Sequence, residues 1–144
     1  MSILFPKIYL IGSLRNPIVP ELGVELRKLG YEIFDDWFGS GPEADDYWQK
    51  YEHQRGRTYK AALAGHAATT IFNLDKHHLE SADAAVLVLP AGKSAHMEFG
   101  WFAKDKPGFI LFDKEPERYE VMYKFATDLC FSRQELIEAL KGVL

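Results

Sequence analysis

An uninterrupted apolar segment at residues 84–89 constrains the fold of this chain more than any other feature of its sequence. The segment is rich in Val and Leu, and Pro90 and Gly92 end it. Helices cover both faces of a parallel sheet, so its central strands are apolar at every position rather than at alternate ones. The segment therefore predicts the central strand of a parallel sheet.

The residues near the start of the chain predict a β-α-β unit. Residues 7–11 have the composition of a strand that ends at Gly12, residues 20–29 have helical spacing and stop at Gly30, and residues 31–34 form a second strand. Two strands that are joined by a helix at this spacing run parallel, with a right-handed crossover.

The rest of the chain continues the alternation of helices and strands. We expect helices at residues 43–63, 75–81, 94–104, 115–126 and 132–144, and a further strand at residues 108–112. The composition of residues 67–72 favours a strand while their setting favours a helix, and this choice stays open. The fold class that follows is α/β: a doubly wound, flavodoxin- or Rossmann-like three-layer sandwich around a mostly parallel sheet of four or five strands.

Composition limits the domain count and the partners. With 144 residues, of which 47% are hydrophobic, the chain is expected to form a single domain over residues 1–144. A net charge of −4 and the lack of a Lys/Arg stripe argue against a nucleic-acid polymer as the partner. One cysteine, Cys130, and no long apolar run predict a cytoplasmic protein that has no membrane partner.

Glu98 is the first candidate for chemistry. Ser94 is a good N-cap for the helix after the central strand, which places Glu98 about one turn into that helix. The positive end of the helix dipole would then keep the carboxylate ionised, available as a nucleophile or a base. The alternative is a surface glutamate that only stabilises the helix, but the neighbours Met97 and Phe99 would desolvate it in part.

The loop after the first strand is a candidate anion site. Gly12 and Ser13 leave backbone N–H groups near a helix start, and Arg15 adds a fork of donors that suits a phosphate or a carboxylate. Arg15 could equally be a plain surface residue. The loop matches neither the G-x-G-x-x-G fingerprint nor the P-loop, so we expect no nucleotide cofactor.

Other polar and aromatic residues fall near the expected ends of strands. Asp75 is an acid–base candidate, whereas Asp83, just before the central strand, is better explained as a turn residue. Asp36 and Trp37 follow the second strand, where an aromatic ring can stack on a flat heterocycle or simply join the core. No histidine has metal-ligand spacing, so no metal is expected. His96 could touch a ligand anion or cover the helix start.

Together these residues resemble the nucleoside 2-deoxyribosyltransferase superfamily, which includes the nucleoside 5'-monophosphate N-glycosidases. The resemblance covers residues 9–112. It rests on the segments Tyr9-x-x-Gly12-Ser13, Asp75 ahead of Ala82-Asp83, Ser94-Ala-His-Met-Glu98-Phe-Gly100, and Lys106-Pro107. The spacing of these segments taken together is more specific than any one of them alone.

The resemblance implies a retaining displacement at the anomeric carbon of a nucleoside. Glu98 would attack C1', Tyr9 would hydrogen-bond Glu98, and Asp75 would protonate or hydrogen-bond the leaving base. The Arg15 loop, together with Ser94, is similar to the phosphate-holding loop of the monophosphate N-glycosidases. The resemblance also implies a homodimer or larger homo-oligomer. The alternative is a non-catalytic nucleotide-binding sensor or partner-binding module on the same fold.

Overall fold

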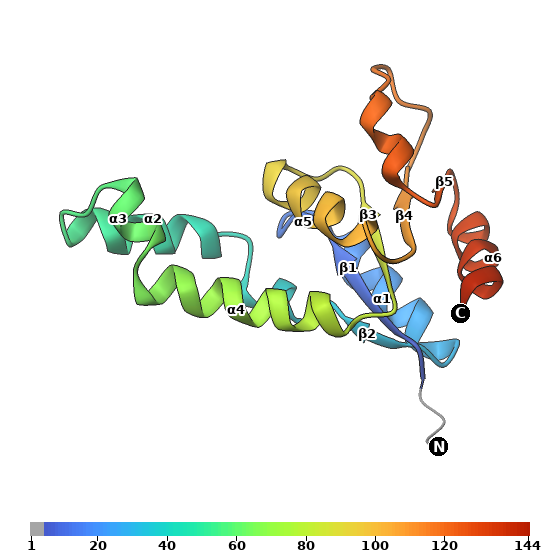
Figure 1. Cartoon of the computed structure of the whole chain (residues 1–144), viewed down its shortest axis with the longest axis horizontal. Helices are drawn as coiled ribbons and strands as arrows, with labels where there is room; N and C mark the ends of the chain where they lie inside the picture. Colours follow the sequence, from blue (N-terminus) through green and yellow to red (C-terminus); the bar gives the residue numbers. More distant parts are fainter. Residues whose placement is uncertain (1–4) are drawn as a thin grey trace.

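The computed structural model describes residues 5–144 and is built on one five-stranded sheet, in which all neighbouring strands are parallel (Figure 1). The strand order is β2-β1-β3-β4-β5. The strands are β1 (Lys7–Ile11), β2 (Glu32–Phe34), β3 (Ala84–Val88), β4 (Gly108–Leu111) and β5 (Asp128–Cys130). The predicted α/β fold class is confirmed.

Helices cover both faces of this sheet. They are α1 (Ile18–Lys28), α2 (Ala44–Gln54), α3 (Tyr59–Leu63), α4 (His66–Ser81), α5 (Lys93–Ala103) and α6 (Arg133–Val143), with short 3-10 helices at Asp36–Ser40 and Val121–Phe125. One apolar cluster joins the sheet to α1 and α6, and a second joins its other face to α4 and α5. These two clusters make the three layers of the sandwich. Among residues 5–144, every helix is too short or too polar to span a lipid bilayer.

The apolar segment at residues 84–89 contains the central strand β3. All five of its residues are buried, because β1 and β4 flank it and helices cover both of its faces. The chain proceeds from β1 to β2 on one side and from β3 to β5 on the other, so the winding reverses between β1 and β3. Ligands of open α/β sheets bind where the winding reverses, beside the carboxyl ends of the strands.

The long helix predicted for residues 43–63 was wrong, because the chain forms two helices there. α2 ends at Gln54, and Gly56 follows with a φ of +70° that a helix cannot contain. Thr58 then starts α3 by accepting a hydrogen bond from the Ala61 N–H at 3.2 Å. Residues 67–72, whose composition favours a strand and whose setting favours a helix, are helical and belong to α4. α2, α3 and the first half of α4 form the arm (residues 44–74), which projects from the sheet in Figure 1.

The helix predicted for residues 115–126 was also wrong. Only a 3-10 turn forms there, at Val121–Phe125, and Asp128–Cys130 adds the edge strand β5, which the sequence pattern did not reveal. Pro116 disfavours a helix through the start of this segment. Cys130 is buried in the core. The capping box of the last helix is present, since Ser132 Oγ accepts from the Glu135 N–H at 3.0 Å.

Candidate active site

Three of the predicted site residues meet between the sheet, α4 and α5. Tyr9 is the middle residue of β1 and is 1% exposed. Its hydroxyl donates a hydrogen bond of 2.9 Å to Oε2 of Glu98 on α5. Asp75 on α4 is close enough for its charge to act on both Tyr9 and Glu98. We call these three residues the Glu98 cluster.

Burial controls the electrostatics of Glu98. Desolvation raises the pKa of Glu98 from 4.5 to about 7, the hydrogen bond from Tyr9 opposes that rise, and the charge of Asp75 adds to it. The expectation that the helix dipole keeps Glu98 ionised was therefore wrong. α5 begins at Lys93, so Glu98 lies beyond the first turn, where the effect of the dipole has faded.

The other two members of the cluster have raised pKa values as well. Burial raises the pKa of Asp75. Burial first, and then the charges of Glu98 and Asp75, raise the pKa of the Tyr9 hydroxyl, which stays neutral and donates. A neutral donor that fixes one oxygen of Glu98 holds its rotamer. With a pKa near 7, Glu98 can act as a nucleophile or as a base at neutral pH, next to a second carboxyl that can carry a proton.

The loop after β1 lies where the winding of the sheet reverses. A side chain at Gly12 would lie 2.9 Å from Val19 Cγ2 and 3.4 Å from the Val88 carbonyl, so the loop packs closely against the end of β3. Ser13 Oγ accepts from the Arg15 N–H at 3.1 Å. The Arg15 guanidinium lies 3.3 Å from Asp45 and from Asp46 at the start of α2. The Arg15 side chain is half-exposed and forms ion pairs with these two residues of the arm.

Asn16 is a residue of this loop that the sequence analysis missed. It is 5% exposed, and its Nδ2 lies 3.4 Å from the carbonyl oxygens of Val88 and Pro90. Its Oδ1 accepts from the Ile18 N–H at 3.1 Å. Asn16 therefore ties the loops after β1 and β3 together. Its position two residues before Ile18 is the spacing of an Asx turn, but nothing local reveals the contacts with β3.

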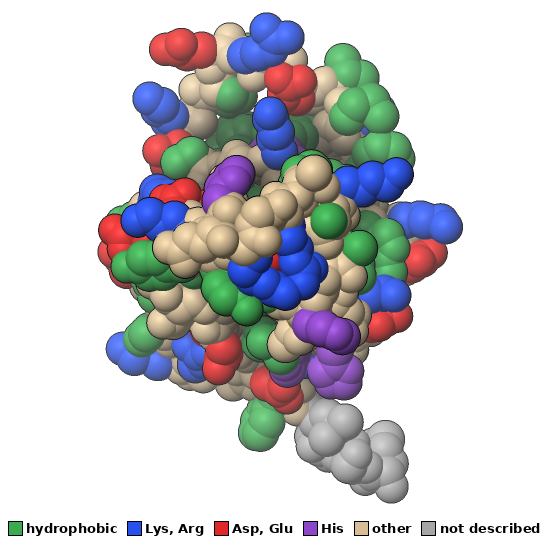
Figure 2. Space-filling view, turned by 90° about the vertical axis from the view of Figure 1, so that its left-hand side faces the viewer, with side chains coloured by type: hydrophobic (Ala, Val, Ile, Leu, Met, Phe, Trp, Pro, Cys, Tyr) green, Lys and Arg blue, Asp and Glu red, His purple; other side chains and the backbone are tan. Residues whose placement is uncertain are grey.

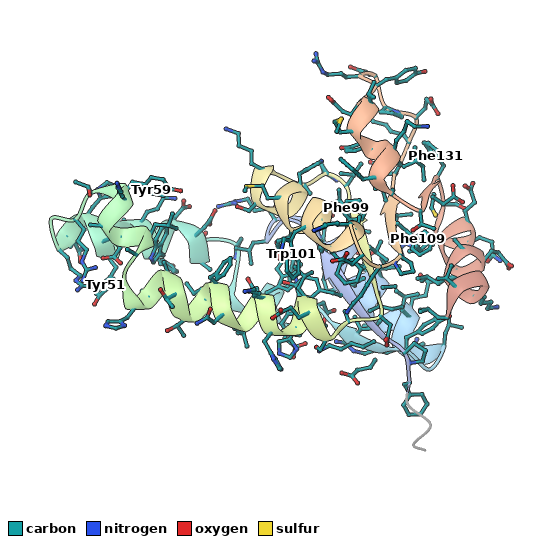
Figure 3. The ribbon with its side chains drawn as sticks, in the orientation of Figure 1. Tyr51, Tyr59, Phe99, Trp101, Phe109 and Phe131 are labelled. Atoms are coloured by element: carbon teal, nitrogen blue, oxygen red, sulfur yellow. The ribbon has the colours of Figure 1, made fainter. Side chains whose placement is uncertain are left out.

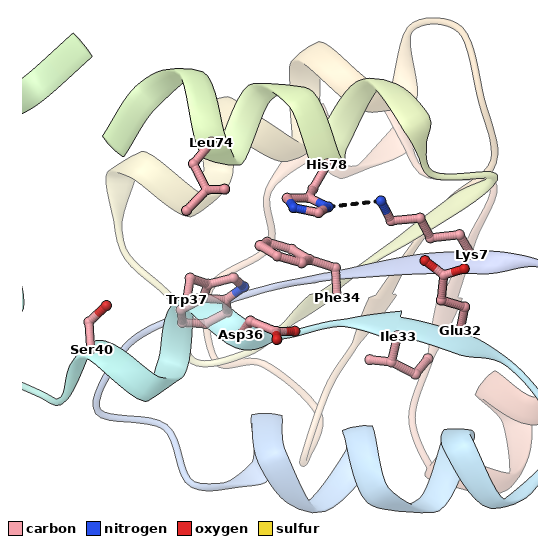
Figure 4. A pocket seen from close by; sticks show the side chains of 9 residues that line it. All are labelled: Lys7, Glu32, Ile33, Phe34, Asp36, Trp37, Ser40, Leu74 and His78. Carbon is pink, nitrogen blue, oxygen red and sulfur yellow. Dashed lines mark hydrogen bonds between the residues drawn. The ribbon is translucent and has the colours of Figure 1, made fainter. Parts of the chain in front are cut away.

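Asp36 and Trp37 lie beside the Glu98 cluster rather than in it. Trp37 is half-buried, and its Nε1 donates to the Leu10 carbonyl at 2.8 Å, so the ring packs into the core. Asp36 is exposed and lines, with Trp37, a cavity of about 440 Å³ between β2 and α4 (Figure 4). The Phe34 ring separates this cavity from the cluster, because its centroid is 5.0 Å from that of Tyr9 and 3.9 Å from that of His78.

Ser94 and His96 lie in the first turns of α5, in settings that differ from those expected. The N-cap of α5 is Gly92 rather than Ser94, because the cap lies two residues earlier and Ser94 is exposed inside the first turn. His96 Nδ1 is 2.7 Å from the Gly92 carbonyl oxygen, and His96 Nε2 is 2.8 Å from the hydroxyl oxygen of Tyr123. The imidazole therefore fastens the 3-10 turn over residues 121–125 to α5.

The remaining residues of the resemblance lie at the amino ends of the strands. Asp83 Oδ2 accepts from the Lys7 N–H at 2.8 Å, and the Asp83 N–H donates to the Lys7 carbonyl at 2.7 Å. Lys106 Nζ lies 2.6 Å from the carbonyls of Glu80 and Ala82 at the end of α4. These groups hold β1, β3 and α4 together, as the structural interpretation of Asp83 predicted. Within residues 5–144, no group of three or more His, Cys, Asp or Glu side chains is placed to hold a metal ion.

Comparison with known proteins finds a similar structure but no similar sequence. No protein-family model and no curated protein matches the sequence. The structure is similar to that of a 2-deoxyribosyltransferase from the psychrotolerant bacterium Bacillus psychrosaccharolyticus, with a TM-score of 0.62 and 16% sequence identity over 90% of this chain and 89% of that one. At this identity the similarity establishes a shared fold.

Proposed function

We propose that this protein cleaves or transfers at the N-glycosidic bond of a (deoxy)nucleoside or a nucleoside 5'-monophosphate, through a covalent intermediate on Glu98. The observation that carries the proposal is the hydrogen bond of 2.9 Å from Tyr9 to Glu98, with Asp75 beside it. An oriented carboxylate within electrostatic reach of a second carboxyl supports the proposal. Two-step displacement at a sugar carbon requires this pair.

The proposed reaction has two balanced steps. In the first, ionised Glu98 forms a bond to C1', the C1'–N bond breaks with its electron pair going to the base, and Asp75 gives that base a proton. In the second, a water or an acceptor base attacks C1' while Asp75 takes a proton from it, and the Glu98 carboxylate leaves. Tyr9 holds Glu98 in the attacking rotamer throughout.

Substrate binding in this proposal uses the residues around the end of β1. The loop formed by Gly12, Ser13 and Arg15 and the helix start carrying Ser94 and His96 face the sugar or its 5'-phosphate, since both offer donors at the point where the winding reverses. Asp36 and Trp37 border the site on its β2 side. The protein of similar fold is named a 2-deoxyribosyltransferase and is described as a biocatalyst for nucleoside synthesis, which supports nucleosides as the substrate class.

A homodimer or larger homo-oligomer is part of the proposal. Large apolar side chains are exposed on α4 and α5, and they include Ile71, Phe72, Met97 and Trp101. Contiguous exposed apolar surface is typical of subunit interfaces. Light scattering after size exclusion should give at least twice the mass of one chain, and Phe72→Glu should shift the mass toward that of one chain.

The first experiment is a chromatographic assay of the purified protein with a panel of nucleosides and 5'-monophosphates, with and without a free acceptor base. Release of base from monophosphates alone would make the protein a nucleotide N-glycosidase and assign the phosphate to Arg15. Exchange of bases would make it a transferase. Lack of turnover with every substrate would contradict the proposal.

The second candidate function is a non-catalytic nucleotide-binding module. The half-exposed Arg15 favours it, because a guanidinium in the loop after β1 can bind an anion without chemistry once that anion displaces Asp45 and Asp46. Glu98→Ala separates the two functions. An enzyme keeps its ligand affinity and loses turnover by orders of magnitude, whereas a binding module shows no turnover in either form.

A further inference from the structure

The arm contains a cavity of its own, away from the Glu98 cluster. It has a volume of about 380 Å³ and is formed by α2, α3 and the turn between them. The lining residues are Trp48, Gln49, Glu52, His53, Arg57, Tyr59 and Ala62. Figure 3 shows Tyr59 and the neighbouring Tyr51 at this end of the molecule, far from Phe109 in the core. Neither the fold of the sheet nor the proposed reaction uses these side chains.

Glu52 is the acidic group of the arm cavity, and only one of its oxygens is paired. The residue is 3% exposed. Its Oε1 lies 3.4 Å from Arg55 Nη1 and 3.5 Å from Arg57 Nε. Its Oε2 is buried and has no hydrogen-bond partner. Buried carboxylate oxygens are nearly always hydrogen-bonded in folded proteins, so Oε2 is an atom of the arm that a bound donor would satisfy.

Trp48, one helical turn before Glu52, carries an unpaired hydrogen-bond donor rather than an acceptor. Its Nε1–H is buried and also lacks a partner, and within residues 5–144 these two are the buried side-chain atoms left without one. Residues four apart on a helix share a face, so the donor of Trp48 and the acceptor of Glu52 belong to the same side of α2. Both residues line the arm cavity, so an occupant that inserts between them would meet one hydrogen-bond donor and one acceptor.

The charges around Glu52 define the occupant further. Arg55 and Arg57 together outweigh the charge of Glu52, so a cation or a metal ion is disfavoured. Figure 2 looks onto the end of the molecule that carries the arm, and Lys and Arg side chains gather near the middle of that face. The cavity is also roughly ten times the volume that one water occupies, about 30 Å³, and lies within the size range of small-molecule sites.

We propose that the arm cavity is a binding site for a neutral heterocycle with a lactam edge, the chemistry of a free pyrimidine or oxopurine base. The ring carbonyl accepts from Trp48 Nε1, and the adjacent ring N–H donates to Glu52 Oε2. Arg57 holds the carboxylate from the other side, and its guanidinium is fixed by close packing against Gly65 at the start of α4. The site is independent of the proposed reaction, because it does not include Glu98.

The experiment is a titration of the intact 15N-labelled protein with uracil, followed at the indole N–H resonances of the three tryptophans. The matched ligand is 1,3-dimethyluracil, which keeps the ring and both carbonyls but has no N–H for Glu52. We expect the Trp48 resonance to move saturably with uracil, and 1,3-dimethyluracil to bind at least about tenfold more weakly because a hydrogen bond to a charged group is lost.

Two variants complete the test. Trp48→Phe assigns the resonance and should weaken the binding of uracil several-fold in calorimetry, while Trp101→Phe, an identical change on α5, should leave it unchanged. The proposal is overturned if the Trp48 resonance stays in place at saturating uracil, if both ligands move it equally, or if only Trp37 beside the Glu98 cluster responds. The titration requires no turnover, so failure of the proposed function would leave its result intact.

Discussion

The Glu98 cluster and Asp83 both contact β1, but they lie in opposite electrostatic settings. Glu98 accepts a hydrogen bond from the neutral hydroxyl of Tyr9, the charge of Asp75 acts on both, and burial raises the pKa of both carboxyls. Asp83, at the amino ends of β1 and β3, accepts a backbone N–H and is exposed to solvent. An acid whose hydrogen bonds are complete holds the chain together. An acid with a raised pKa and an acidic neighbour is available for proton transfer or attack.

The largest effect that separates the Glu98 cluster from Asp83 is on turnover. If the proposed function is correct, Glu98→Gln should lower kcat for nucleosides by about 10⁴-fold, because the amide cannot form the intermediate. Asp83→Asn, a change of the same kind, should leave kcat within about twofold. Steady-state assays with the substrate found in the panel measure both. Equal losses of kcat in the two variants would contradict the assignment of catalysis to Glu98 and of a structural role to Asp83.

Glu98→Gln should lower turnover but raise the stability of the folded protein. The Glu98 pKa of about 7 in the folded protein exceeds 4.5, so the folded state binds the proton more tightly and the free energy of unfolding falls as the pH rises between these values. That difference corresponds to about 3 kcal/mol at most. Glu98→Gln should therefore raise the denaturation midpoint at pH 8 and have little effect at pH 4.5. Urea unfolding at the two pH values measures this, and a variant less stable at pH 8 would contradict it.

Asp75 should affect both the rate and its pH dependence. Under the proposed function, Asp75→Asn removes the proton donor to the leaving base and should lower kcat by about 10²-fold. It also removes a charge that raises the pKa of Glu98, so the rise of kcat/KM with pH should move to lower pH. A pH profile of the variant measures the shift. A loss of rate with an unchanged profile would mean that Asp75 does not act on Glu98.

Much of this arrangement could be predicted from the sequence, because it depends on local pattern. β1, β3 and β4 follow from apolar runs, and the helices that pack on them follow from spacing and from caps such as Ser132. The predicted hydrogen bond from Tyr9 to Glu98 is also present, although their catalytic roles stay predictions. The expectations of a single domain, a cytoplasmic location and the absence of a cofactor or metal stay predictions too.

The features that could not be predicted depend on contacts between distant residues. The three-residue strand β5 forms because β4 offers it an edge, and its own sequence is too short to show a period. His96 binds Tyr123, 27 residues away, and Asn16 binds Val88, 72 residues away. The neighbours Met97 and Phe99 indicate some desolvation of Glu98, but its extent, and so the raised pKa, depends on packing between distant elements.

Tyr9→Phe should have a smaller effect, on the pKa of Glu98 and on the pH dependence of the rate. The hydrogen bond from Tyr9 lowers the pKa of Glu98, so its loss should move that pKa above about 7 and shift the rise of kcat/KM to higher pH, opposite to Asp75→Asn. At pH 7 the rate should fall about tenfold, and part of it should return at pH 9. The pH profile measures both, and a loss that is uniform across pH would show that Tyr9 acts only on packing.

The smallest effect is expected at the amino ends of the strands. Asp83→Ala removes the acceptor of the Lys7 N–H and should lower the free energy of unfolding by about 1 kcal/mol, with kcat unchanged. Asp83→Asn keeps an oxygen at the same place and should recover most of that loss. Urea midpoints of the two variants, compared at pH 7, measure the difference. Because the Asp83 carboxylate accepts a hydrogen bond from the backbone, its removal acts on the fold alone, whereas the same chemical change at Glu98 should trade stability against turnover.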